Sequence, residues 1–556
     1  MVFKMIFFQS LYPNYLPAIV RVLRRGYTPL LFARDLWSGI TVGIVALPLA
    51  MAFAIAAGAS PEQGIFTALV AGFIISGLGG SRFQIGGPTG AFVVIVGSII
   101  VRHGYDGLVV AMLLAGLLLF IMGLFNFGQF LKFIPYPVIT GFTTGIALLI
   151  VATQIKDFLG LNLAHEPSAF LDRLEACFNA LPTASSTALT LSVGTLSVML
   201  LIRHFAPKVP AHIVGICFAT AIVWTMGLPV ETIGSHFGGI PAELPHFHMP
   251  VLNIALIRAE FPDALTIALL AGIESLLSAV VADGMTGSRH NSTVELMAQG
   301  LANIASGLFG GIPATGAIAR TATNIRAGAY SPVSGLIHVA TLATFLMICS
   351  GLLYHIPLAS LAAVLIVVAW DMSELHRFKR LLHAPKMDSA VLLLTFGLTV
   401  FVDLTVAVQV GVVLSALLFM KRMSEVSGVC ELSTNIEGLA PKEKRTENIM
   451  VYEINGPFFF GMAQRFIDTM QFTRNTPKVL IIRLAHVYHI DATAIEALEG
   501  VVQKAHQSGI LVILAELSPG IRKILRSMGT KSLVGQDNIL PDFQAAMVRA
   551  KEAVKK

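Results

Sequence analysis

A succession of apolar segments, each about twenty residues long, runs from Leu36 to Met420 and limits what this chain can fold into. A helix needs about twenty apolar residues to cross the hydrocarbon core of a bilayer, so these segments can span it. Of all residues, 55% are hydrophobic and 13% are charged, about half the charge of a soluble protein. The sequence therefore predicts a polytopic membrane protein, followed after Met420 by a domain of soluble composition.

The apolar segments form two sets of seven, which predicts an all-α membrane domain at 31–425 with inverted repeats over 36–228 and 262–424. An odd number of spans makes the second repeat enter the membrane from the opposite side. The fourteen predicted spans are 36–58, 62–79, 84–100, 107–125, 136–155, 185–203 and 211–228, then 262–284, 292–310, 312–326, 333–353, 357–371, 387–403 and 404–424.

The stretch from Gly307 to Gly328 is too polar and too broken to be a full span. Its glycines, Pro313 and two arginines leave only about ten to fourteen residues for a regular helix, which is half the length that a bilayer requires. We therefore predict a half-helix. Its start would present free backbone N–H groups and the positive end of a helix dipole inside the membrane, a setting that suits an anion.

A second broken stretch, Gly77–Gly97, lies at the corresponding place in the first half. Its sequence Pro88-Thr89-Gly90-Ala91 corresponds to Pro-Ala-Thr-Gly-Ala at 313–317. Paired, interrupted segments of this kind indicate the substrate site of a secondary transporter built from inverted repeats. The alternative is that both are glycine-rich turns between packed helices.

Basic residues concentrate in the loops that would share a side with the N-terminal segment 1–30. Cytoplasmic loops are enriched in Lys and Arg, so both termini are predicted to be cytoplasmic, with the polar segments 156–184 and 229–261 outside. This bias explains the net charge of +6 without a nucleic-acid partner. The four cysteines are scattered and predict neither a disulfide framework nor a metal site.

After a polar linker at 426–447, residues 448–556 read as a small α/β domain. Strands are expected at 449–454, 479–484 and 510–514, and helices at 463–472, 492–506, 521–528 and 543–554. The turn from Gly456 to Gly461 lacks the Lys of a phosphate-binding loop, so no nucleotide site is predicted.

The chain resembles the sulfate permease family, bacterial relatives of the solute carrier family 26 anion transporters. The resemblance is carried by the segment from Asp35 through Pro48, by Gly86–Ala91, by Glu274–Gly287 and by the half-helix at 313–328. It implies a seven-plus-seven fold in which spans 1–4 and 8–11 form a mobile core and the other spans a scaffold. It also implies a homodimer, a C-terminal STAS domain and a bacterial inner-membrane location.

Two departures narrow this resemblance. Leu49 follows the proline of the first span, where many sulfate-type members carry Gln, and the chain looks more similar to the branch of aerobic C4-dicarboxylate transporters. In the STAS domain, Ala492 stands where related bacterial regulators carry a phosphorylated Ser. Asp491 is expected to cap the following helix, and Thr493 is the weaker alternative acceptor.

Glu274 is the outstanding ionisable residue of the predicted spans. A carboxylate in the middle of a spanning helix costs at least about 2.5 kcal/mol, so a functional role is the first hypothesis. We expect Glu274, with Ser278 one turn on, to couple anion transport to a co-transported proton, or alternatively to Na⁺. The alternative is a purely structural role, in which Glu274 pairs with a neighbouring arginine.

Arg320 lies one turn into the second half-helix, where its charge would add to the two helix ends. It could instead form a salt bridge with Glu274 or lie behind the site. Thr89 and Thr315 offer hydroxyls near the two half-helix starts, with helix capping as the alternative. The residues expected to contact substrate are Thr89, Gly90, Ala91, Phe92, Thr315, Gly316, Ala317, Ile318, Ala319 and Arg320.

The predicted function is proton-coupled uptake of a small anion such as succinate or fumarate by alternating access. Sulfate or bicarbonate transport is the alternative, and a membrane-tethered regulator that uses the STAS domain as its output is a third hypothesis. No nucleophile-base set appears, so neither an enzyme nor a bound cofactor is predicted. The expected partners are the anion, membrane lipid, a second copy and a possible cytoplasmic protein at the STAS domain.

Deleting residues 440–556 should leave anion preference unchanged, because the linker separates the STAS domain from both half-helices. Expression, assembly or rate should fall instead. The measurement is how strongly each anion of a panel inhibits uptake of a labelled anion. A well-folded deletion variant with altered preference would contradict the prediction.

Overall fold

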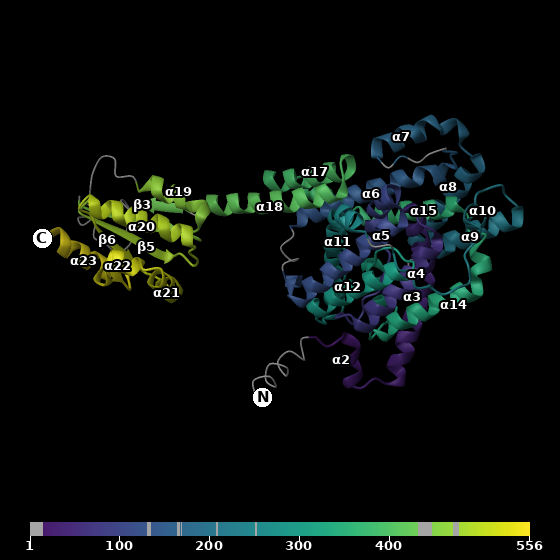
Figure 1. Cartoon of the computed structure of the whole chain (residues 1–556), viewed down its shortest axis with the longest axis horizontal. Helices are drawn as coiled ribbons and strands as arrows, with labels where there is room; N and C mark the ends of the chain where they lie inside the picture. The colour runs from purple at the N-terminus through teal and green to yellow at the C-terminus, as the bar shows by residue number, and fades with distance from the viewer. Residues whose placement is uncertain are drawn as a thin grey trace. The chain divides into compact units, whose positions relative to one another are not determined.

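The protein is described by a computed structural model that covers residues 15–129, 135–163, 167, 169–206, 209–250, 253–426, 428–431, 448–470 and 477–555. The chain divides into two compact units, Met1–Val413 and Leu414–Lys556. The first unit is an assembly of helices, and the second combines strands with helices (Figure 1).

Helices in the first half of the membrane unit begin with the short α2. They are α2 (Ala18–Arg24), α3 (Pro29–Ala56), α4 (Pro61–Leu78), α5 (Val93–Leu124), α6 (Tyr136–Leu159), α7 (Phe170–Asn179), α8 (Ser186–Phe205) and α9 (Ala211–Met226). The second half has α10 (Ile233–Phe237), α11 (Ile254–Thr286), α12 (Ser292–Leu308), α13 (Ile318–Arg326), α14 (Val333–Leu353), α15 (Leu358–Met372), α16 (Leu375–Leu381), α17 (Lys386–Phe401) and α18 (Leu404–Val426). Within the described ranges nine helices are long and apolar enough to cross a membrane.

The structure corrects several predicted boundaries. The spans expected at 84–100 and 107–125 share one long element, α5, which bends at Gly104 because its φ of 69° departs from helical backbone. The polar segment 156–184 contains α7, and 229–261 contains α10 and the first turns of α11, whose start is capped by Asn253. The span predicted at 312–326 shrinks to the nine residues of α13.

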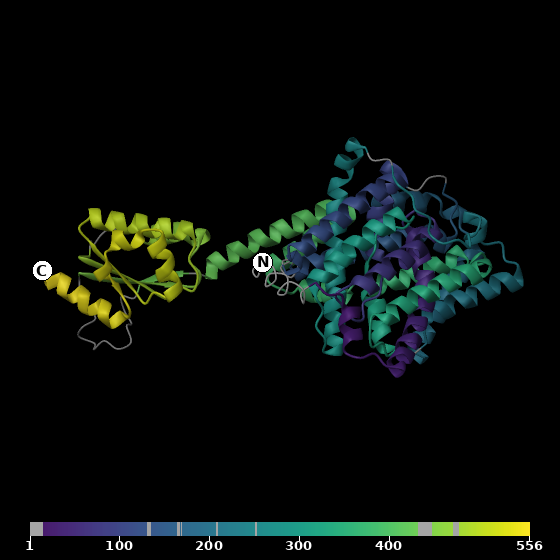
Figure 2. The ribbon, with the colours of Figure 1, turned by 60° about the horizontal axis from the view of Figure 1, so that its bottom comes forward.

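The membrane helices form two groups that draw on both repeats. The core group consists of α3, α4, α5, α11, α12, α13 and α14. Within it α5 lies along α11 and α12, and α3 and α4 pack on α14 (Figure 1 and Figure 2). The scaffold group consists of α6, α8, α9, α15, α17 and α18. In it α6 packs on α15 and α17, and Gly411 of α18 approaches Thr395 of α17.

The two broken segments meet inside the core group as a short antiparallel ladder. Strand β1 (Gly86–Gly87) pairs with β2 (Thr315–Gly316), with Gly86 opposite Gly316 and Gly87 opposite Thr315. A Cβ at Gly316 would lie 1.5 Å from Nε2 of Gln84, so this close approach requires glycine. The sequence predicted these segments as a pair, and the structure places them in direct contact.

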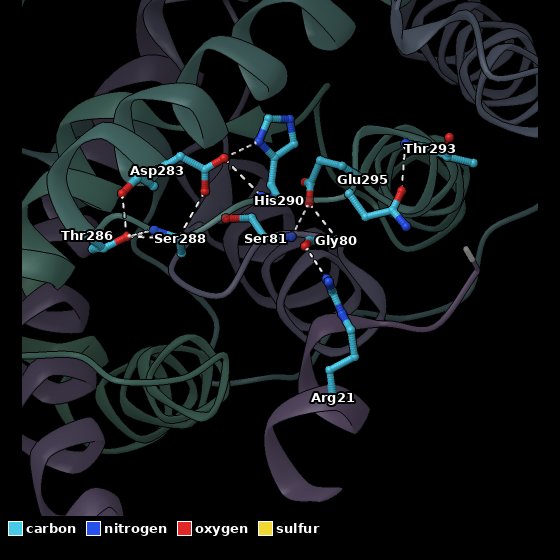
Figure 3. Close-up of polar contacts among 11 residues, drawn as sticks. Arg21, Gly80, Ser81, Asp283, Thr286, Ser288, His290, Thr293 and Glu295 are labelled. Atoms are coloured by element: carbon cyan, nitrogen blue, oxygen red, sulfur yellow. Dashed lines mark hydrogen bonds and ion pairs between the residues drawn. The ribbon is translucent and has the colours of Figure 1, made fainter. Parts of the chain in front are cut away.

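Carboxylates of each repeat hold turns of the other. Asp35 of α3 accepts the backbone N–H groups of Tyr330 and Ser331, at 2.6 and 3.0 Å. Glu295 of α12 accepts those of Gly80 and Ser81, at 2.9 and 3.0 Å (Figure 3). Both carboxylates are fully buried, so these four bonds tie the repeats together.

The same view shows how the N-terminal helix and the α11–α12 loop join this brace. Arg21 of α2 donates to the Gly80 carbonyl at 2.7 Å. Asp283, in the last turn of α11, accepts from Ser288 and from both the backbone and the ring of His290 (Figure 3). These bonds fix the loop between α11 and α12 to the end of α11.

Among its described residues, the second unit has one five-stranded sheet of order β3-β4-β5-β6-β7, in which β3 and β4 are antiparallel and the other neighbours are parallel. Its strands are β3 (Gly428–Glu431), β4 (Ile449–Asn455), β5 (Val479–His486), β6 (Leu511–Ala515) and β7 (Ile539–Leu540). Its helices are α19 (Phe460–Thr469), α20 (Ala492–Gln507), α21 (Pro519–Ser527), α22 (Thr530–Val534) and α23 (Phe543–Lys555). Hydrophobic clusters cover both faces of the sheet.

Most of the predicted α/β elements match, but the predicted linker 426–447 is wrong at its start. Gly428–Glu431 forms β3 because it pairs with Tyr452–Asn455 of β4. Positions 432–447 lie outside the described residues. Asp491 caps α20 as predicted, by accepting from the Ala494 N–H at 2.9 Å.

Gly316→Ala should destabilise the protein, because its methyl group overlaps the buried Gln84 amide, and overpacking of this kind costs about 1–3 kcal/mol. We expect a lower apparent melting temperature, partly restored by adding Gln84→Ala. Gly284→Ala is the matched control, since nothing lies within 4 Å of its added Cβ. Equal melting temperatures for the Gly316 and Gly284 variants would contradict this packing.

Candidate functional site

The site lies where the middle of α11 meets the starts of the two broken segments. Thr89 Oγ1 donates to Glu274 Oε2 at 3.1 Å, which joins the first segment to the carboxylate on α11. Thr89 directly precedes the 3₁₀ turn η2 (Gly90–Phe92), and no side chain caps that turn. Both Thr89 and Glu274 are partly buried, so the structure brings together two residues that the sequence singled out.

The second segment begins in the same way. Ala317 occupies the N-cap of α13 and has no side chain that could cap it. Ile318 and Ala319, in the first turn, are exposed, whereas Ala317 is buried. Uncapped N–H groups and the positive end of a helix dipole therefore lie at an exposed first turn, an arrangement that favours anions.

Thr315 and Gly316 serve the framework of the site. The Thr315 and Ser275 hydroxyls lie 2.7 Å apart, and Thr315 also donates to the Ala271 carbonyl at 3.0 Å. The Gly316 N–H donates to Ser275 Oγ at 3.1 Å. Thr315 and Ser275 are fully buried, so the Thr315 hydroxyl expected to meet substrate is instead directed at α11.

Ser278 is likewise committed to packing. Its hydroxyl donates to Thr321 Oγ1 at 3.1 Å, and Thr321 accepts from the Ile85 N–H at 3.1 Å. Both hydroxyls are fully buried. This chain fixes α13 against both α11 and the start of β1, one turn away from Glu274.

Arg320 lies behind the ladder and makes no ion pair with Glu274 among the described residues. Its Nη2 donates to the Pro88 carbonyl, and its Nη1 packs where a Cβ on Gly87 would lie only 2.5 Å away. Only 4% of the residue is exposed. The sequence left three positions for Arg320, in contact with substrate, paired with Glu274 or behind the site, and the structure supports the last.

Apolar side chains from three helices surround the first segment. A Cβ at Gly90 would lie 3.1 to 3.4 Å from Ile150 of α6, Phe53 of α3 and Met372 of α15. Ala91 and Phe92 are buried beside it. The site therefore lies between the core group and the scaffold group.

Sequence reasoning missed Ser275 and Thr321, the two hydroxyls that organise the site. Ser275 directly follows Glu274 and lies three residues before Ser278, so the two serines share one face of a helix. That shared face was the available signal. Thr321 had none, because its partner lies 43 residues away.

The multi-pass membrane domain thus contains two uncapped helix starts, one of them beside the Glu274 carboxylate, an arrangement that suits the transport of anions. The Sulfate permease family pattern matches residues 32–395, and the STAS domain pattern matches residues 440–546. The chain belongs to the sulfate permease family, whose members are transporters rather than enzymes.

Individual relatives agree with this assignment over nearly their whole length. YvdB of Bacillus subtilis, which bears a provisional name as a sulfate transporter, is 41% identical over 519 residues, covering 92% of this chain and 97% of its own. The bicarbonate transporter BicA of Picosynechococcus sp. is 30% identical over 536 residues, covering 93% and 94%. The murine Solute Carrier 26 family member A9 structure, 17% identical, superposes with a TM-score of 0.87 over 98% of this chain and 95% of that chain, and so shares the fold.

Thr89→Val removes the donor to Glu274 at nearly constant volume, and we expect anion affinity to fall by about three-fold to ten-fold. Thr89→Ser should retain affinity. Thr266→Val is the matched control, because the Thr266 hydroxyl donates within α11, to the Pro262 carbonyl. Titration calorimetry with sulfate and succinate measures the affinities, and equal loss in the Thr89 and Thr266 valine variants would count against the site.

Proposed function

We propose that this protein is a secondary active transporter that moves a small oxygen-bearing anion together with a proton by alternating access. The observation that carries the proposal is the hydrogen bond from Thr89 to Glu274, which connects a helix start suited to an anion with a group that can hold a proton. The same hydroxyl cannot donate to both partners at once. Anion binding and proton binding are therefore linked through the side chain of Thr89.

In the proposed cycle, an ionised Glu274 engages the Thr89 hydroxyl. Protonation removes the negative charge from the carboxyl group and weakens its hydrogen bond with Thr89, because hydrogen bonds to ionised groups are roughly twice as strong as neutral ones. The hydroxyl can then turn to an anion at the start of η2. Proton binding thereby prepares the site for the anion.

Charge balance supports the same direction of coupling. Each helix start contributes about half a positive charge, and Arg320 adds a full charge through a low-dielectric region even though it lies behind the ladder. When Glu274 is neutral, this positive field faces the anion uncompensated. When Glu274 is ionised, its charge repels the anion and lowers affinity.

We propose a proton rather than Na⁺, because a proton demands fewer ligands. A sodium ion would need several further oxygen ligands around the Glu274 carboxylate, and the hydroxyl of Thr89 is one such oxygen. The carboxyl group alone suffices for a proton. Sodium coupling remains the alternative that the experiment below distinguishes.

The proposed cargo is a C4-dicarboxylate such as succinate or fumarate, on the resemblance of the span motifs to that branch. The names of the two relatives place sulfate and bicarbonate beside it as alternatives. We further propose a bacterial inner-membrane location with cytoplasmic termini, and a homodimer whose STAS domains meet a cytoplasmic partner.

The test uses the full chain in proteoliposomes, with separate proton and sodium gradients and radiolabelled succinate, sulfate and bicarbonate. Wild-type protein should accumulate one of these anions under the proton gradient. Glu274→Gln keeps the shape of the side chain but fixes it neutral, so anion binding should persist with less dependence on pH. Accumulation driven by the pH gradient should be lost.

Glu243→Gln is the control, because Glu243 is an exposed carboxylate outside the site. Intact proton-driven accumulation by Glu274→Gln would remove Glu274 from the coupling mechanism. Accumulation only under the sodium gradient would replace the proton with Na⁺. Absence of uptake for every anion by wild-type protein would contradict the proposed cargo.

A further inference from the structure

A hydrogen bond joins the core group to the scaffold group at the face where α3 ends and α11 begins. Thr405 Oγ1 donates to Asp263 Oδ1 at 3.2 Å. Asp263 belongs to α11, in the core group, and Thr405 lies in the first turn of α18, in the scaffold group. The two residues are 142 apart in sequence, so the contact depends on how the two groups meet.

Each partner is held firmly by its own group. The second carboxylate oxygen of Asp263 pairs with Arg102 of α5 at 2.7 Å, and the Asp263 side chain is only 8% exposed. On the other side, Asp403 accepts from the Thr405 N–H at 2.6 Å and so fixes the first turn of α18. A movement of one group away from the other would therefore separate the two partners.

The contact borders a cavity between the two groups. The cavity has a volume of about 340 Å³, and its walls include Asp263 and Val94 from the core group and Thr153 and Leu404 from the scaffold group. Val94 lies two residues after Phe92, the end of η2. The cavity thus extends from this face toward the first segment of the candidate site.

We propose that Asp263 is the gating residue of this face: its hydrogen bond with Thr405 holds the cavity shut and must break whenever the anion site opens here. Alternating access requires the core group to move against the scaffold group. A bond made in only one of two states shifts the equilibrium toward that state by its own free energy. The inference rests on the transport function of the family and holds whichever anion or ion is carried.

The experiment measures how readily the cavity opens in the full chain. Val94→Cys supplies a reporter in a background where the four native cysteines are replaced by Ala, and a charged maleimide is added to purified protein in detergent. Thr405→Val removes the donor at nearly constant volume. Losing one hydrogen bond should raise the labelling rate by between about two-fold and ten-fold.

Two controls separate gating from general loosening. Thr405→Ser keeps the hydroxyl, so its labelling rate should match the background. Thr153→Val also removes a hydroxyl from the cavity wall, but Thr153 donates to Ile150 and accepts from Gln154. Both partners belong to α6, so the rate should stay unchanged. An equal rise for the valine variants at 153 and 405, or no rise at 405, would overturn the proposal.

Arg102→Gln provides a second, independent variant. It leaves the Asp263 carboxylate without its core-side ion pair, so the bond to Thr405 loses its anchor and labelling at Val94→Cys should rise again. If Thr405→Val does not yield a monodisperse protein, this variant decides alone. A background labelling rate for folded Arg102→Gln would then overturn the gating role.

Discussion

The structure depends on satisfying backbone hydrogen bonds at the centre of a bilayer, where no bulk water is available. The two broken segments leave regular helix there, and each free N–H or C=O group would cost several kcal/mol in lipid. Strands β1 and β2 meet part of this need in one another, and Ser275 and Thr321 meet more of it from the sides. The N–H groups at the starts of η2 and α13 have no side-chain cap, and they belong to the candidate site.

Because some groups hold the framework and others remain for the site, corresponding residues of the two repeats differ in role. Thr89 and Thr315 hold matching places in the two repeats, yet Thr89 bonds the carboxylate and Thr315 bonds the wall of α11. The asymmetry arises because α11 passes one segment at Glu274 and the other at Ser275. Under the proposed function, a transporter built from two similar halves thereby has one carboxylate for the coupled ion in place of two.

Much of the fold could be predicted from the sequence, because bilayer length and glycine-rich interruptions act locally. The pairing of Gly77–Gly97 with Gly307–Gly328 followed from such signals, as did the α/β order of the second domain. Strand β3 could not be predicted, because that polar stretch becomes a strand through its pairing with β4. The commitment of Ser278 and the place of Arg320 behind the ladder depend on contacts across more than 40 residues, which composition does not encode.

The braces formed by Asp35 and Glu295 bear on how the protein is made. Glu295 emerges from the ribosome 215 residues after Gly80, whose turn it holds, and synthesis at about 5–20 residues per second sets a delay of about 10–40 s. During that interval the first broken segment has neither its strand partner nor its carboxylate. The nascent first half must wait within the insertion machinery or lipid, unfinished, until the second half arrives.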